Sequence, residues 1–91
     1  MMLFYVKIQL RMDKMAEMLE KSSKGEIPSP AKYSTIYCSN AEPGLGYSIF
    51  DVDSKEQLDE ILDKLKPYSE VYEVAHVITL KEFQAKMSGE S

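Results

Sequence analysis

The fold is decided by residues 47–78, which read YSIFDVDSKEQLDEILDKLKPYSEVYEVAHVI. Residues 47–52 alternate in the way that a strand with one buried face does. Asp53 or Ser54 can cap a helix, because each is followed three residues later by a glutamate or a glutamine. Leucine and isoleucine then recur at helical spacing until Pro67 stops the helix, and a second strand-like run follows. The stretch therefore predicts a βαβ unit, for which a right-handed crossover is expected.

The residues before this unit repeat the same order of elements. Residues 3–10 are rich in aromatic and β-branched side chains and predict a strand. Residues 12–24 place methionine and leucine at helical spacing, and Glu20 and Lys24 stand four apart as an expected ion pair. Residues 31–39 alternate again and predict a strand that a Pro-Gly turn joins to the next one. A strand, a helix and a strand thus precede the second strand-helix-strand unit.

The order β-α-β-β-α-β predicts an α+β, ferredoxin-like domain with an antiparallel sheet and both main helices on one face. Thr79 and Glu82 make a capping box and predict a short C-terminal helix. With 91 residues the chain is too short for a second folding unit. We therefore expect a single domain over residues 1–87 and a disordered tail over residues 88–91.

Composition excludes several classes of function. The net charge is -4 and Arg11 is the only arginine, so the clustered positive charge that nucleic acid requires is missing. Cys38 is the only cysteine and there is one histidine, which argues against a disulfide, a metal site or a bound cofactor. No apolar run approaches the length of a membrane span or acts as a signal peptide. We expect a cytoplasmic protein that contacts neither nucleic acid nor membrane.

One face of the predicted sheet should lack a cover. The apolar rows of the strands are expected to face the two helices, which leaves the opposite rows exposed. Those rows carry tyrosines, which are too apolar to leave in water but whose hydroxyls need partners. We expect two copies to pack sheet to sheet as a homodimer or larger homo-oligomer, with the gap either closed by interdigitation or open as a small-molecule pocket. The tyrosines expected to bind a flat ligand, or equally to pack an interface, are Tyr5, Tyr33, Tyr37 and Tyr47.

Three polar side chains are candidates for catalysis. Lys7 lies in the middle of the first strand on the uncovered face, where its ammonium can donate to a carboxylate or carbonyl, or pair with Asp51. Asp51 can accept a proton from a carbon acid, or serve as the acidic half of that pair. His76 is of the residue type that most readily exchanges protons near neutral pH, although a single histidine is more often a structural residue.

Three further expectations concern burial. Cys38 should point to the helix side as a buried, inert thiol. The methionines of the first helix are expected in the core, with a soft docking surface as the alternative. The fourth strand has two possible orientations, and we favour the one that puts Tyr72, Val74 and His76 on the uncovered face, because histidine is a poor core residue.

Parts of the chain resemble a known family. The string MLFYVK at residues 2–7, the string YSIFDV at residues 47–52 and the acidic-capped leucine helix that stops at Pro67-Tyr68 are similar to muconolactone isomerase. That family belongs to the dimeric α/β-barrel superfamily, which also holds the YCII-related and GYD-type domains and small cofactor-free monooxygenases. The ending ITLKEF at residues 78–83 is similar to the close of GYD-type domains. The resemblance implies a dimeric α/β barrel of ferredoxin-like chains.

The same resemblance suggests a function. It implies an isomerase-like or cofactor-free enzyme that acts on a small oxygenated organic compound, and of the family's polar positions Lys7 matches. The chain departs from the family around the second strand, where residues 32–39 offer tyrosine, threonine and cysteine in place of tryptophan, arginine and histidine. The alternative is a non-catalytic module that uses the same surface for ligand sensing or assembly.

Overall fold

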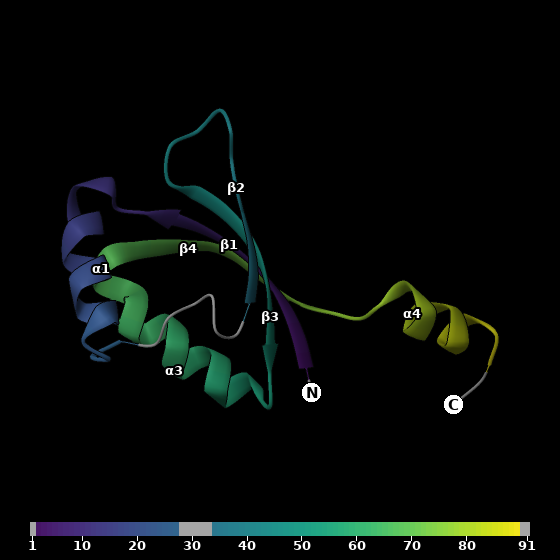
Figure 1. Ribbon diagram of the computed structural model, residues 1–91. Coiled ribbons are helices and arrows are strands. Elements are labelled where there is room, and N and C mark those ends of the chain that lie inside the picture. The colour runs from purple at the N-terminus through teal and green to yellow at the C-terminus, as the bar shows by residue number, and fades with distance from the viewer. Residues whose placement is uncertain (1, 28–33, 90–91) are drawn as a thin grey trace.

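The computed structural model describes residues 2–27 and 34–89. Its centre is a four-stranded antiparallel sheet in the order β2-β3-β1-β4 (Figure 1). The predicted α+β class is therefore confirmed, and the strand order is compatible with a ferredoxin-like arrangement. Residues 31–33 of the predicted second strand, Tyr33 among them, lie outside the described residues. The strands are β1 (Met2–Leu10), β2 (Ser34–Cys38), β3 (Leu45–Val52) and β4 (Ser69–Val77).

Two helices lie on one face of the sheet, and a third stands away from it beyond the end of β4 (Figure 1). None of the helices within the described ranges has the length and apolar character needed to cross a membrane. The helices on the sheet are α1 (Met15–Ser23), which follows the 3-10 turn η1 (Met12–Lys14), and α3 (Lys55–Leu65), which continues into the 3-10 turn η2 (Lys66–Tyr68). The helix that stands away is α4 (Leu80–Met87).

The start of α3 shows which of the two possible caps the chain uses. Ser54 is the N-cap, and its side-chain oxygen accepts a hydrogen bond from the backbone N–H of Gln57 at 3.2 Å. In return, the Gln57 side chain accepts a hydrogen bond from the backbone N–H of Asp53 at 2.7 Å. This reciprocal arrangement gives a partner to one backbone donor of the first helical turn and to the backbone N–H of the residue before the N-cap. It fixes the point at which β3 ends and α3 begins.

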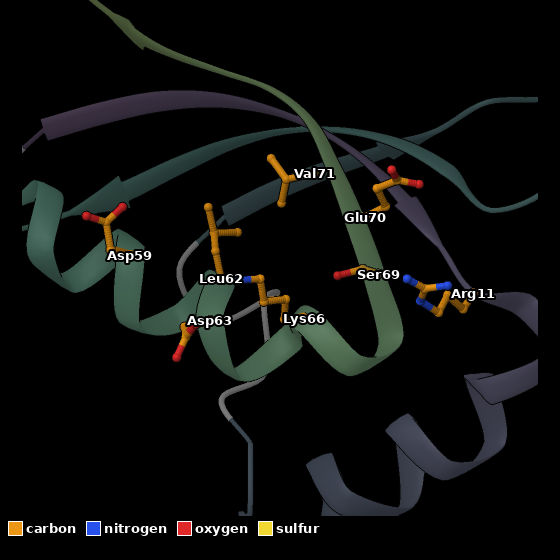
Figure 2. A pocket seen from close by; sticks show the side chains of 8 residues that line it. All are labelled: Arg11, Asp59, Leu62, Asp63, Lys66, Ser69, Glu70 and Val71. Atoms are coloured by element: carbon orange, nitrogen blue, oxygen red, sulfur yellow. The ribbon is translucent and has the colours of Figure 1, made fainter.

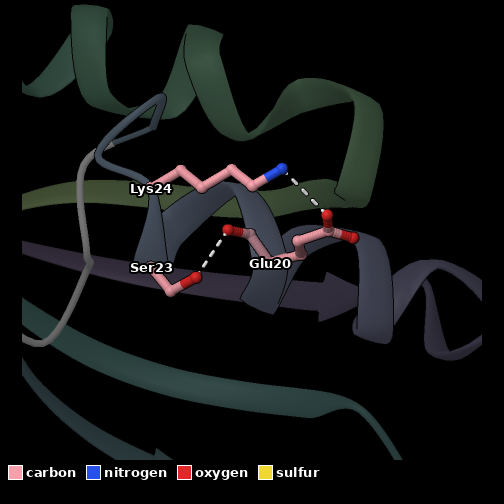
Figure 3. Close-up of polar contacts among 3 residues, drawn as sticks. All are labelled: Glu20, Ser23 and Lys24. Carbon is pink, nitrogen blue, oxygen red and sulfur yellow. Dashed lines mark hydrogen bonds and ion pairs between the residues drawn. The ribbon is translucent and has the colours of Figure 1, made fainter.

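Polar contacts at the end of α1 follow the predicted spacing. The Lys24 ammonium lies 3.0 Å from a carboxylate oxygen of Glu20, and the Ser23 hydroxyl donates to the backbone carbonyl of Glu20 at 2.7 Å (Figure 3). The expected ion pair is therefore confirmed. Because both side chains are more than half exposed, the pair contributes only about 0.3–0.5 kcal/mol. These contacts define the end of α1 but do not hold it against the sheet.

The core lies between α3 and the sheet. Residues directly opposite one another on neighbouring strands share a face, so Phe4 of β1 and Phe50 of β3 stand side by side beneath the helices. This confirms the predicted helix-facing rows of β1 and β3. Met18 and Ile27 pack only at the margin of this cluster. The buried cluster consists of Phe4, Val6, Phe50, Val52, Leu58, Ile61 and Leu65.

A β-bulge in β4 changes which of its side chains face the helices. Val71 stands opposite Ile8, but Glu73 stands opposite Lys7, so Tyr72 is an extra residue without a partner on β1. The two segments of β4 on either side of Tyr72 therefore follow opposite parities. Neither single alternation that the sequence suggests describes the whole strand.

The last residues of the described chain form a turn. The backbone N–H of Ser88 donates to the backbone carbonyl of Gln84 at 3.0 Å, and the backbone N–H of Gly89 donates to the backbone carbonyl of Lys86 at 3.2 Å. Residues 90–91 lie outside the described residues. The disordered tail that the sequence suggests for residues 88–91 therefore stays a prediction.

Candidate functional site

The sheet face opposite α1 and α3 carries the tyrosines that the sequence places there, apart from Tyr33, which lies outside the described residues. None of the described helices covers this face (Figure 1), which we call the bare face. The described residues on it are partly or fully exposed, apart from Leu45. The bare face consists, by strand register, of Leu3, Tyr5, Lys7, Gln9, Thr35, Tyr37, Leu45, Tyr47, Ile49, Asp51, Glu70, Glu73, Ala75 and Val77.

A polar row crosses the middle of the bare face. Each strand contributes one residue at the same register, and the order is Tyr37, Tyr47, Lys7 and Glu73. The Lys7 ammonium lies 6.0 Å from the centre of the Tyr47 ring, at the outer limit of a cation–π contact. Lys7 and Tyr47 are half-buried, whereas Tyr37 is 64% exposed. The predicted placement of Tyr37, Tyr47 and Lys7 on one surface is confirmed.

The next row of the bare face is more apolar. It runs across the sheet as Thr35, Ile49, Tyr5 and Ala75. A third row places Leu3 between Asp51 and Val77. Tyr5 thus lies between Ile49 and Ala75. The polar row lies on one side of it along the strands, and the row that contains the Asp51 carboxylate lies on the other.

Lys7 and Asp51 share the bare face but do not meet. Asp51 stands opposite Leu3, which is four residues from Lys7 along β1, or about 13 Å along the strand. The ion pairs among the described residues are Lys24–Glu20 and Lys55–Asp59, so the alternative in which Lys7 pairs with Asp51 is wrong. Lys7 instead faces Glu73 across the β1–β4 ladder. The bulge at Tyr72 brings that carboxylate to this side.

His76 lies on the other side of the sheet. It stands opposite Phe4, and the two rings are 5.1 Å apart between centroids. The favoured expectation that Val74 and His76 belong to the bare face is therefore wrong, because the bulge reverses the parity of β4. Since β4 is an edge strand, His76 can sit on the helix side and still be exposed. Lys7, Asp51 and His76 do not converge, and their catalytic roles stay predictions.

A cavity of about 380 Å³ opens between α1 and the sheet, and we call it the α1 cavity. None of the residues of α1 is buried, so the methionines that were expected in the core line this cavity instead. The sequence feature that could have indicated the cavity is the run of methionines itself, because flexible methionine side chains commonly line adaptable binding surfaces. Its described lining is Ile8, Leu10, Met12, Met15, Met18, Leu19, Ser22, Ile27, Ile36, Cys38, Gly44, Gly46, Ser48, Phe50 and Leu65.

Among the described residues, few polar atoms reach the α1 cavity. The Ser48 hydroxyl is buried and donates to the backbone carbonyl of Val6 at 3.1 Å, which leaves it able to accept one further hydrogen bond. Cys38 is on the predicted helix side but is exposed, so the expectation of a buried thiol is wrong; it belongs to β2, which is an edge strand of the sheet. Along the described lining there is no charged side chain. The described lining therefore suits an apolar molecule and supplies no charged acid or base.

A second hollow of about 490 Å³ lies between α3 and the start of β4. Acidic and basic side chains both line it, and Figure 2 shows their charged groups spread along the groove instead of converging on one point. Such a mixed lining favours no particular ligand charge. Within the described ranges, no group of three or more His, Cys, Asp or Glu side chains is placed to hold a metal ion. The lining residues are Arg11, Asp59, Leu62, Asp63, Lys66, Ser69, Glu70 and Val71.

The candidate sites are thus the bare face and the α1 cavity, on opposite sides of the sheet. Neither gathers a complete set of catalytic groups from the described residues of one chain. The resemblance to muconolactone isomerase rests on the quoted sequence strings alone. No protein-family model, no curated protein and no solved structure matches this chain.

Proposed function

We propose that this protein binds a small, largely apolar organic molecule in the α1 cavity. The observation that carries the proposal is the cavity itself, with its volume of about 380 Å³ and its lining of aliphatic, methionine and phenylalanine side chains. Binding sites for small molecules commonly measure about 300–1,000 Å³ and are mostly apolar with a few polar groups. The sequence suggested a pocket between two sheets, whereas this cavity belongs to one chain and lies on the helix side.

The lining points to an uncharged ligand. A charged ligand that enters an apolar site loses hydration worth about several kcal/mol, unless an opposite charge in the site compensates for it. No described lining residue supplies such a charge. Ser48 and Cys38 offer single polar contacts near β2 and β3. A compact neutral compound with one or two oxygen atoms fits this chemistry.

Binding without catalysis is favoured over catalysis. Isomerisation of a lactone needs a proton acceptor within hydrogen-bond reach of the substrate carbon. Lys7 and Asp51 lie on the bare face, and His76 does not line the α1 cavity. An isomerase-like or cofactor-free enzyme is the alternative, in which a second copy would enclose a pocket against the polar row of the bare face.

The proposal includes assembly as a homodimer or larger homo-oligomer of the dimeric α/β-barrel type, in the cytoplasm. The strand order and the uncovered tyrosines support sheet-to-sheet packing, because removing aromatic side chains from water lowers the free energy of the assembly. The lone cysteine is consistent with a reducing compartment.

A fluorescence titration with the neutral apolar dye N-phenyl-1-naphthylamine tests the proposed ligand site. We expect saturable binding to the wild-type protein and a loss of about tenfold or more in affinity for Cys38→Trp, whose large ring would fill the rim of the cavity. Tyr37→Trp is the matched control, because Tyr37 is the preceding residue on β2 and points to the bare face.

The control variant should bind the dye as the wild type does. Absence of saturable binding to the wild-type protein would contradict the proposed cavity. Equal weakening in both tryptophan variants would place the dye elsewhere and contradict it as well.

A further inference from the structure

Helix α4 carries an apolar stripe that touches little of its own chain. Leu80, Phe83 and Met87 recur at helical spacing, and they are 71%, 51% and 73% exposed. Figure 1 shows the helix standing away from the sheet and from α1 and α3. The radius of gyration of 14.9 Å exceeds the value of about 12 Å for a compact chain of this length, as a projecting arm requires.

The sequence caps helix α4, but the apolar side chains of the helix are largely exposed. Thr79 caps α4, accepting a hydrogen bond from the backbone N–H of Glu82 at 3.1 Å. Isolated helices shorter than about 12–15 residues are marginal in water, and α4 has eight residues. Helices in proteins are held mainly by the packing of their apolar face. The stripe of α4 therefore needs a surface that the described residues of its own chain do not provide.

The α1 cavity of the same chain cannot be that surface. Only Ile78 and Thr79 separate β4 from α4, so the helix stays near the end of the sheet at which Leu3 pairs with Val77. On β1 the described lining of the cavity is Ile8 and Leu10, which lie towards the opposite end of the strand. Thr79 is extended and directs α4 outward from that end.

The size of the bare face indicates what covers the stripe. Four strands spaced about 4.8 Å apart, over about seven residues of about 3.3 Å each, make a flat area of roughly 450 Å² per copy. Two such faces bury roughly 900 Å², less than the about 1,200 Å² of the smallest stable interfaces. A helix about 12 Å long and about 10 Å wide buries roughly 120 Å² of its own surface and roughly 120 Å² of the surface on which it packs. Two exchanged arms raise the total to about 1,400 Å², within the range of stable dimers.

Charge points to the same partner. The whole chain carries -4, but the segment Leu80–Met87 holds two lysines, Lys81 and Lys86, against one acid, Glu82, and is therefore +1. The rest of the chain must then carry -5. A locally positive arm is attracted to a copy of an acidic body, whereas two acidic bodies alone repel each other.

We propose that α4 is an exchanged arm, and that in the dimer the stripe of Leu80, Phe83 and Met87 packs on the second copy of the chain. This inference rests on the proposed sheet-to-sheet dimer, because the bare face brings the second copy next to the root of the arm at Val77. The arm supplies the part of the buried area that the sheet face lacks.

Sedimentation equilibrium over a series of protein concentrations tests the exchange. Phe83→Glu should raise the dissociation constant of the dimer about tenfold or more, because it places a carboxylate in the buried stripe. Ala85→Glu is the matched control: it makes the same change in charge two residues away, on the opposite side of α4. The control should dimerise as the wild type does. Since α4 stands away from the core, neither variant should change the thermal unfolding of the monomer.

The outcomes separate the two proposals. A wild-type protein that is monomeric at every concentration would overturn the dimer and the exchanged arm together. A wild-type dimer that Phe83→Glu leaves equally tight would overturn the arm alone. Hydrogen exchange of the α4 amides provides a second measurement: protection that rises with protein concentration is expected, and protection independent of concentration would mean that α4 folds back on its own chain and would overturn the exchange.

Discussion

Gly44 is the residue whose replacement the structure predicts to be most costly among the glycines of the turns. Its φ of +82° lies in the left-handed region, and a Cβ added there would approach the Gln9 side chain to 2.6 Å and the Leu10 carbonyl to 2.9 Å. The Leu10 N–H also donates to the Gly44 carbonyl at 2.8 Å, so the turn cannot simply move away. We expect Gly44→Ala to lower the free energy of unfolding by about 2–3 kcal/mol, measured by urea denaturation.

Gly25 provides the control for that measurement. Its φ of +75° carries the same backbone preference, but nothing lies within 4 Å of the position a Cβ would take. Gly25→Ala should therefore cost only about 1 kcal/mol, the conformational part of the effect. If the two variants unfold at the same urea concentration, the close approach of Gly44 to β1 is wrong.

At the level of single residues, the sequence predicted local features well and distant ones poorly. The Ser54 cap and the Glu20–Lys24 pair depend on residues three or four positions apart, and both are found. The relation of Lys7 to Asp51 depends on strand register, which the spacing along one strand does not contain. The exposure of Cys38 depends on its place in an edge strand, which is a tertiary property.

The bulge in β4 is the feature at the level of elements with the largest effect on the candidate site. It places Glu73 opposite Lys7 on the bare face and sends Val74 and His76 to the helix side. Alternation of side chains predicted the strands and the helix-facing rows of β1 and β3. In β4 both alternating sets of residues contain apolar side chains, so the sequence pattern does not reveal the bulge. The same limit applies to α1, whose methionine stripe predicts a helix but not whether the helix closes on the sheet.

Deletion of single residues tests this register. Removing Tyr72 should leave Val71 opposite Ile8 and Glu73 opposite Lys7, so each segment keeps its face and the free energy of unfolding should change by about 1 kcal/mol or less. Removing Ala75 should move Glu73 to the face occupied by Val6 and cost about 2 kcal/mol or more. Urea denaturation of both variants measures the difference, and equal destabilisation would contradict the bulge.

For the whole molecule, the two sides of the sheet divide the proposed roles. The helix side holds the cavity in which we propose that a ligand binds, and the bare face and α4 carry the exposed apolar side chains that we propose a second copy covers. The sequence predicted the uncovered face because tyrosines and aliphatic residues share one parity on β1 and β3. It could not predict the cavity, since a void is the space that several elements fail to fill and no single element encodes it.

Ile49 tests the role of the bare face itself. It lies half-buried in the apolar row between Thr35 and Tyr5, and a lysine there would place an ammonium in the middle of a dry interface. We expect Ile49→Lys to raise the dissociation constant of the dimer about tenfold or more in sedimentation equilibrium, because an aliphatic side chain contributes about 1.5–3 kcal/mol on burial. Val74→Lys makes a similar change on the other face of the sheet, where Val74 is 39% exposed, and should leave the dimer intact. If the two lysine variants dissociate to the same extent, the contact between copies does not involve the bare face.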